Sequence, residues 1–188
     1  MIVDGVKTKK SQRVVVVADT PNLYKGTQEA FGCDFEPDYT ELLSIAKSRG
    51  SRLTAFAMVN DGLPRRHVTS LRLRGFVVLT SEGRDCDYRF VDQAISMHNS
   101  GDVFILCGGD GRYANLASVL RGINKYVIVS AVRTTCSFRL LRTANEFFPF
   151  PVTYSSSGSR RPATKPISLM ELHPRDLEIG GGLYLRDF

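Results

Sequence analysis

The sequence predicts an α/β fold in which helices cover both faces of a mainly parallel sheet, with the predicted strands in an order of about 3-2-1-4-5. Short apolar runs alternate along the chain with amphipathic stretches of helical length. Two of these runs, residues 13–18 and 103–107, are almost entirely apolar, as expected for strands that are buried on both faces. This alternation indicates a doubly wound sheet with right-handed crossovers.

The strands and helices follow from the apolar pattern and from capping residues. Asp38 is a good N-cap for a helix that ends before Gly50, and Pro64 suits the start of the next helix. Thr20-Pro21-Asn22 is expected to break the first strand, and the polar, Gly-containing residues 25–37 predict a loop. Strands are predicted at residues 13–18, 52–59, 76–80, 103–107, 126–132 and 147–150, and helices at 39–48, 64–74, 87–98, 112–121 and 137–145.

Shifts in composition predict three parts of the chain. Residues 1–12 form a short basic arm, residues 13–150 form the α/β domain, and residues 151–188 form a basic linker with a C-terminal tail. The linker prediction rests on the run from Ser155 to Pro162, which is rich in serine and arginine.

Composition indicates the class of partner and the compartment. The 188-residue chain has a formal net charge of +6, which favours a polyanion such as nucleic acid over charges that only aid solubility. The four cysteines form no CxxC pair, so neither a disulfide framework nor a zinc site is expected. No apolar stretch reaches the length of a membrane span, and the N-terminus lacks a signal-peptide core. We therefore expect a reducing, cytoplasmic location.

Two predicted strands are followed by an aspartate at the same edge of the sheet. Asp19 follows the first strand, and Asp110 follows the fourth after two glycines. The carboxyl ends of the strands at a switch point form the ligand crevice of an open α/β sheet, so we expect the two carboxylates to share it. A plain N-cap role is the alternative for Asp19.

A third group of acids lies between the third strand and the third helix. Asp85 and Asp92 are seven residues apart, on one helical face if the helix begins early, whereas Asp87 and Asp92 are five apart and diverge. Capping of the helix also explains Asp85 or Asp87, and Asp92 also fits a solvated helix position. The loop that follows the third strand can reach the crevice, so we expect one of Asp85 and Asp87 to lie there.

Several carboxylates in one crevice repel one another unless a cation is present. Mg²⁺ or Mn²⁺ supplies that charge, because hard cations prefer carboxylate and water oxygens. The chemistry that uses such a cluster is phosphodiester hydrolysis, in which the metal activates a water and offsets charge on the leaving oxygen. The acids therefore predict a metal-dependent nuclease centre.

Four segments carry family motifs in a fixed order. They are VVVADTPNLY at 15–24, EGRDCD at 82–87 followed by Asp92, FILCGGDG at 104–111 and SFRLLRTANEF at 137–147. They resemble the strand with Asp-Gly-x-Asn-Leu, the Lys-Gly-x-Asp element, the Leu-x-Ser-Gly-Asp strand end and the closing Ser-x-x-Leu-x-x-x-Ala-Asp-x-Phe helix of NYN domains. These domains, also called LabA-like, belong to the PIN-like nuclease superfamily. The resemblance spans about residues 13–150.

The resemblance implies a PIN-like fold and metal-dependent cleavage of RNA, with Mg²⁺ or Mn²⁺ as cofactor. Asn22 matches the family's asparagine near the site, and Asp92 fits the family's next helix with a one-residue slip in the spacing before it. The acids that the resemblance marks as catalytic or metal-binding are Asp19, Asp85 or Asp87, and Asp110.

The sequence departs from the family pattern at three positions. Arg112 stands where the family usually has a second acid, Thr20 replaces a glycine, and Glu82 replaces a lysine. An arginine beside a metal site would repel a cation, or would instead hold a phosphate. The alternative to a ribonuclease is therefore a degenerate NYN domain that binds RNA or a protein partner without cutting.

Two other classes of enzyme fit the motifs less well. The first strand is not followed by GxGxxG, which argues against a Rossmann dehydrogenase. A Toprim-type nuclease would use Asp85-Cys86-Asp87 as its Asp-x-Asp, but it would need a glutamate at the position of Asp19.

The predicted partner is RNA in single-stranded form, bound through its phosphates. We expect the contacts to come from arginines in loops or helix turns that lack nearby acids, and the alternative is that these arginines are only solvated. A homo-oligomer or a protein complex through the C-terminal tail is a further expectation. The candidate phosphate contacts are Arg65, Arg66, Arg133, Arg139, Arg160 and Arg161.

Overall fold

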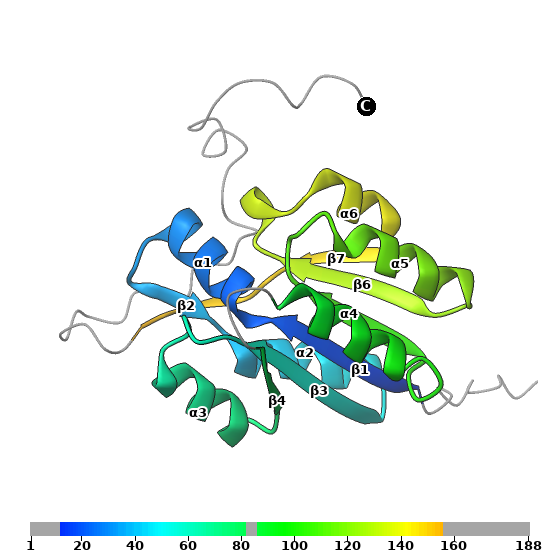
Figure 1. The fold of residues 1–188 in the computed structure, drawn as a ribbon, viewed down its shortest axis with the longest axis horizontal. Helices are drawn as coiled ribbons and strands as arrows, with labels where there is room; N and C mark the ends of the chain where they lie inside the picture. Colours follow the sequence, from blue (N-terminus) through cyan, green and yellow to red (C-terminus); the bar gives the residue numbers. More distant parts are fainter. Residues whose placement is uncertain (1–11, 82–85, 156–188) are drawn as a thin grey trace, which may run out of the picture. The chain divides into compact units, whose positions relative to one another are not determined.

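The main feature of the computed structural model, which describes residues 12–81 and 86–155, is a six-stranded sheet (Figure 1). Its order is β4-β3-β1-β5-β6-β7, and all neighbouring strands run parallel. A separate antiparallel pair joins β2 (Phe35–Pro37) to β8 (Val152–Tyr154). The six strands of the main sheet are β1 (Arg13–Asp19), β3 (Arg52–Val59), β4 (Val77–Thr80), β5 (Val103–Cys107), β6 (Tyr126–Ala131) and β7 (Glu146–Pro149).

The strand order reverses direction between β1 and β5. The chain places β3 and β4 on one side of β1, and then places β5, β6 and β7 on the other side. The predicted order 3-2-1-4-5 corresponds to β4-β3-β1-β5-β6, so this prediction is confirmed, and the predicted short last strand adds β7 beyond β6. A reversal of this kind opens a crevice at the carboxyl ends of β1 and β5.

Helices cover both faces of the sheet, because alternate residues of each central strand point to opposite sides. Val14 and Val16 of β1 belong to the core cluster that includes residues of α1 and α2 and the α3 residue Leu71. Val15 and Val17 belong to the other cluster, with residues of α4, α5 and α6. The helices are α1 (Thr20–Phe31), α2 (Tyr39–Arg49), α3 (Arg65–Leu73), α4 (Asp87–Ser96), α5 (Tyr113–Gly122) and α6 (Phe138–Thr143), with the short 3-10 helix η1 (Arg133–Thr135) before α6.

The first strand ends at Asp19, as the break at Thr20-Pro21-Asn22 predicted, but the predicted loop at 25–37 is wrong. Helix α1 begins directly at Thr20, and residues 35–37 form β2. Proline is tolerated in the first turn of a helix because the N–H it lacks has no partner there, so Pro21 starts α1. Helix α1 continues through Gly26. A Cβ at this position would lie 2.8 Å from Thr135 Oγ1, so the glycine allows α1 to approach η1 closely.

The predicted C-terminal segment 151–188 begins with β8, which pairs with β2. From residue 156 onward, the predicted linker and tail lie outside the described residues, as does the predicted basic arm up to residue 11. Within residues 12–81 and 86–155, no helix combines the length and the apolar character needed to cross a membrane.

Candidate active site

Asp19 ends β1 at the switch point and caps α1. Its side chain accepts a hydrogen bond from the Asn22 N–H at 3.2 Å, and the residue is only 5% exposed. Burial raises the pKa of Asp19 to about 6, and the charges of Asp87 and Asp110 act in the same direction. The cap role considered for Asp19 is therefore confirmed, and the same side chain lies at the switch point of the sheet.

A buried tyrosine, Tyr113, joins Asp19 to Asp87. Its hydroxyl oxygen lies 2.5 Å from Asp19 Oδ2 and 2.8 Å from Asp87 Oδ1. A tyrosine hydroxyl has one hydrogen to donate, and the Tyr113 hydroxyl is placed to donate it to either carboxylate. One buried hydroxyl therefore links the two acids.

Packing between α4 and α5 sets the position of this hydroxyl. The Tyr113 ring stacks on Phe90 with the ring centroids 4.0 Å apart and the planes 18° apart, and both residues are 0% exposed. Sequence reasoning missed Tyr113, because no motif marks it. Its one available signal is its place at the start of the helix that follows Asp110.

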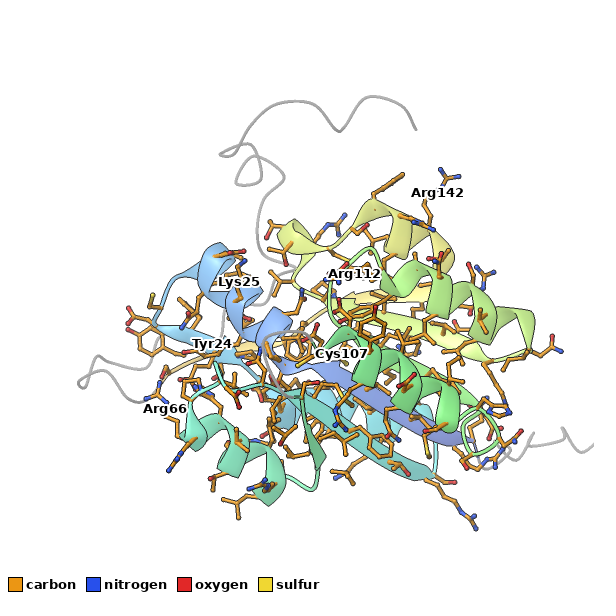
Figure 2. All side chains as sticks on the ribbon, in the orientation of Figure 1. Tyr24, Lys25, Arg66, Cys107, Arg112 and Arg142 are labelled. Carbon is orange, nitrogen blue, oxygen red and sulfur yellow. The ribbon has the colours of Figure 1, made fainter. Side chains whose placement is uncertain are left out.

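Arg112 joins Asp87 to Asp110. Its Nη1 forms an ion pair with Asp87 Oδ2, and its Nη2 and Nε donate to Asp110 Oδ2 at 3.0 and 3.2 Å. The Arg112 backbone N–H also donates to Asp110 Oδ1 at 2.9 Å. Burial acts to raise the pKa of Asp110, but the hydrogen bonds from Arg112 outweigh it and the pKa is lowered. Figure 2 shows Arg112 near the start of α5.

The loop after β5 is held against α1. The Gly109 N–H donates to Asn22 Oδ1 at 2.9 Å, and the Gly109 carbonyl accepts from the Ser137 N–H at 2.8 Å. A Cβ at Gly109 would lie 2.7 Å from the Thr135 carbonyl oxygen, so only glycine fits this approach. Asn22 thus supports the site by fixing the segment that carries Asp110.

Comparison with known proteins identifies the family. The family model of the NYN domain matches residues 13–153. The chain belongs to the NYN domain family. This confirms the predicted family and its PIN-like fold, and it makes the chain a member of the PIN-like nuclease superfamily. The finer LabA-like assignment stays a prediction from the motifs.

A solved structure supports the fold. The crystal structure of a protein of unknown function from Vibrio parahaemolyticus matches with a TM-score of 0.68 and 24% sequence identity. The match covers 79% of this chain and 96% of the other chain. No curated protein matches the chain.

The NYN domain brings most of the predicted acids together. Asp19 and Asp87 meet at the Tyr113 hydroxyl, and Asp87 and Asp110 meet at the Arg112 guanidinium. Asp92 is exposed and lies roughly 140° around the axis of α4 from Asp87, so it is turned away from the other acids. Asp85 lies outside the described residues.

The predicted arginines follow the carboxyl ends of strands. Arg65 and Arg66 begin α3 after β3, and Arg133 and Arg139 lie in η1 and α6 after β6, all exposed. The premise that these arginines lack nearby acids is wrong for Arg66, whose Nη2 lies 3.3 Å from Glu36 Oε1. Arg139 donates to Asn115 Oδ1 at 2.6 Å. The candidates at positions 160 and 161 lie outside the described residues.

The acids fit a hard cation by chemistry but not by their present arrangement. Carboxylate oxygens are the ligands that Mg²⁺ and Mn²⁺ prefer. Among residues 12–81 and 86–155, however, no group of three His, Cys, Asp or Glu residues is placed to hold a metal ion. At this site the Arg112 guanidinium pairs with an oxygen of Asp87 and an oxygen of Asp110.

Proposed function

We propose that this NYN domain is a ribonuclease whose cleavage centre is formed by Asp19, Asp87 and Asp110. The observation that carries the proposal is that these three acids are linked by shared donors, Tyr113 and Arg112, beside the switch point of the sheet. Membership of the PIN-like nuclease superfamily supports the same chemistry. The proposed reaction is hydrolysis of phosphodiester bonds in RNA.

The side chains of the site have separate tasks in this proposal. Tyr113 holds the carboxyls of Asp19 and Asp87 at a fixed spacing, because its ring is locked against Phe90. Asn22 fixes the loop that presents Asp110. Burial at Asp19 excludes water from one side of the cluster and strengthens its electrostatic interactions. The acids are thus preorganised for a charged substrate complex.

The proposed cofactor is Mg²⁺ or Mn²⁺, held by Asp19, Asp87 and Asp110. When bound, such an ion supplies an activated water and offsets charge on the leaving oxygen. The three acids would orient that ion, and the neighbouring arginines would hold the RNA phosphates on either side of the scissile bond.

The proposed substrate is single-stranded RNA. Tyr88 follows Asp87 in the first turn of α4 and is 79% exposed, so its ring is available for a base beside the acids. Exposed aromatic rings next to basic side chains are typical of sites for unpaired nucleotides, since every base has a face that stacks. Arg133 and Arg139, on the elements that follow the carboxyl end of β6, supply positive charge at the same edge of the sheet.

Cleavage of a labelled single-stranded RNA tests the proposal. Asp19→Asn keeps the size and the capping ability of the side chain, but it removes one charge from the cluster. We expect it to reduce Mg²⁺- or Mn²⁺-dependent cleavage by ~100-fold or more, the scale of losing one preorganised partner of developing charge. Asp92→Asn is the matched control and should cleave as the wild type does. Equal cleavage by wild type and Asp19→Asn would reject the proposed centre.

A second candidate function is RNA binding without cleavage, and the Arg112 contacts favour it. An arginine that stays bound to Asp87 and Asp110 would leave the acids without a metal, and the domain would act through its basic surface alone. In that case the wild type binds single-stranded RNA at low salt and leaves it intact with either metal.

A further inference from the structure

We propose that the guanidinium of Arg112 is a built-in counter-ion of the carboxylate cluster, and that a divalent cation binds the cluster only when this side chain moves away. The inference rests on the proposed function, because it concerns the same acids. It adds that the affinity of this chain for Mg²⁺ or Mn²⁺ is set by competition with one of its own residues.

The contacts of Arg112 are those of a bridging cation. One guanidinium spans two carboxylates, with Nη1 on Asp87 Oδ2 and both Nη2 and Nε on Asp110 Oδ2. The planar guanidinium can bridge two acids in this way, whereas a lysine ammonium acts as a single point charge. The cation position between Asp87 and Asp110 is therefore filled by the protein itself.

The acids need such a partner more than surface acids do. The side chains of Asp87 and Asp110 are only 14% and 26% exposed, and Asp19 is buried. Three carboxylates that share one region repel one another, and water screens that repulsion poorly where they are buried. The positive charge of Arg112 reduces this repulsion in the metal-free protein.

Arg112 is also placed where it can leave. Its side chain is 66% exposed, so its release requires no opening of the core. Its backbone is already helical, and its backbone N–H keeps its own bond to Asp110 Oδ1. A positive charge at the start of α5 is disfavoured by the helix dipole, so the guanidinium is held there by the acids rather than by the helix.

The consequence is an exchange between two cations. A divalent ion offers twice the charge of Arg112, but it must first displace the guanidinium from Asp87 and Asp110. Removal of the arginine charge should therefore tighten metal binding and, in the absence of metal, loosen the fold around the acids. A general loss of positive charge elsewhere on the surface should do neither.

Calorimetric titration of Mn²⁺ into the full chain tests the inference. We expect Arg112→Gln to bind Mn²⁺ about tenfold more tightly than the wild type, because an uncharged amide replaces the competing cation. Arg112→Lys should fall between the two, since its ammonium makes fewer contacts with the acids. Arg52→Gln is the matched control, because this exposed arginine lies at the start of β3, at the edge of the sheet opposite the acids, and its Mn²⁺ affinity should equal that of the wild type.

Thermal unfolding gives a second readout that does not depend on activity. In EDTA, Arg112→Gln should unfold at a lower temperature than the wild type, and Mn²⁺ should raise its unfolding temperature more than it raises that of the wild type. A wild type and an Arg112→Gln variant that bind Mn²⁺ with equal affinity would overturn the inference and leave the proposed nuclease standing. Binding of Mn²⁺ by neither protein would overturn the proposed metal site as well.

Discussion

At the scale of single residues, Asp19 stabilises α1 as its N-cap, but its buried negative charge is unfavourable. It caps α1, yet its carboxyl is buried beside two further acids, and burial raises its pKa to about 6. The folded metal-free protein therefore holds this proton more tightly than the unfolded chain does. By linkage, stability decreases as pH rises between the ordinary aspartate pKa of 3.8 and about 6.

Asp19→Asn should therefore stabilise the metal-free protein above pH 6. Asparagine does not titrate and is an equally good N-cap, so the variant avoids the buried charge. The rise in the pKa of Asp19 from 3.8 to about 6 corresponds to about 3 kcal/mol of unfolding free energy at pH 7 to 8. The variant should be more stable than the wild type by this amount, and the two stabilities should become equal near pH 4. Denaturant unfolding in EDTA across this pH range measures it.

The control for this prediction is Asp38→Asn, which changes the aspartate cap of α2. Asp38 accepts hydrogen bonds from the N–H groups of Thr40 and Glu41, and no second acid is bound with it through a shared donor in the described part of the chain. Its exchange should not stabilise the protein above pH 6. A wild type that is as stable as Asp19→Asn at pH 8 would show that the buried carboxyl carries no penalty.

At the scale of elements, the sequence predicted most helices and strands but missed α1. The β1, β3 and β5 runs are mostly apolar on both faces, as expected for buried parallel strands, so their sequence alone was enough to predict them. Helix α1 was missed because Pro21 and Gly26, taken alone, both favour a loop over a helix. In the structure Pro21 lies in the first turn of α1, and Gly26 lies at the contact with η1. The contact at Gly26 is tertiary, and no local pattern records it.

The candidate site was predictable to the same extent. Asp19 and Asp110 follow apolar strands, and sheet topology places them at one edge. The bridges between the acids were not predictable, because Tyr113 reaches Asp19 and Asp87 only through its stacking on Phe90 in another helix. Arg112 was visible as a departure from the family pattern, but its pairing with both acids depends on how α4 and α5 pack.

The loop between β5 and α5 requires a glycine at position 109. Gly109→Ala should destabilise the protein by about 1–3 kcal/mol, because its Cβ would meet the Thr135 carbonyl oxygen at 2.7 Å and the loop must shift. The shift should also break the hydrogen bond to Asn22 and reduce any metal-dependent cleavage. Gly122→Ala is the control, since nothing lies within 4 Å of its Cβ position at the end of α5. That variant should be neutral or slightly more stable in urea unfolding.

At the scale of the whole domain, the parallel sheet places the candidate site residues at one edge, the carboxyl ends of its strands. Every helix that follows a main-sheet strand starts near the carboxyl end of that strand, so residues distant in sequence share this edge. The same rule places Lys47, at the end of α2, and Arg52, at the start of β3, at the opposite edge. Positive charge at the two edges can therefore be compared within one molecule.

RNA binding should depend on the edge that holds the acids. Each phosphate contact to a single strand contributes about 0.7 to the slope of log affinity against log salt concentration. The double variant Arg133→Gln/Arg139→Gln should therefore weaken binding at low salt and reduce the slope by about 1.4, if each arginine neutralises one phosphate. Lys47→Gln/Arg52→Gln removes the same charge from exposed positions at the opposite edge and should leave the slope unchanged. Both slopes can be measured by fluorescence anisotropy with a labelled single-stranded RNA, in proteins that also carry Asp19→Asn to prevent cleavage. Equal slopes for the two double variants would mean that the overall charge of the protein, and not this edge, attracts the RNA.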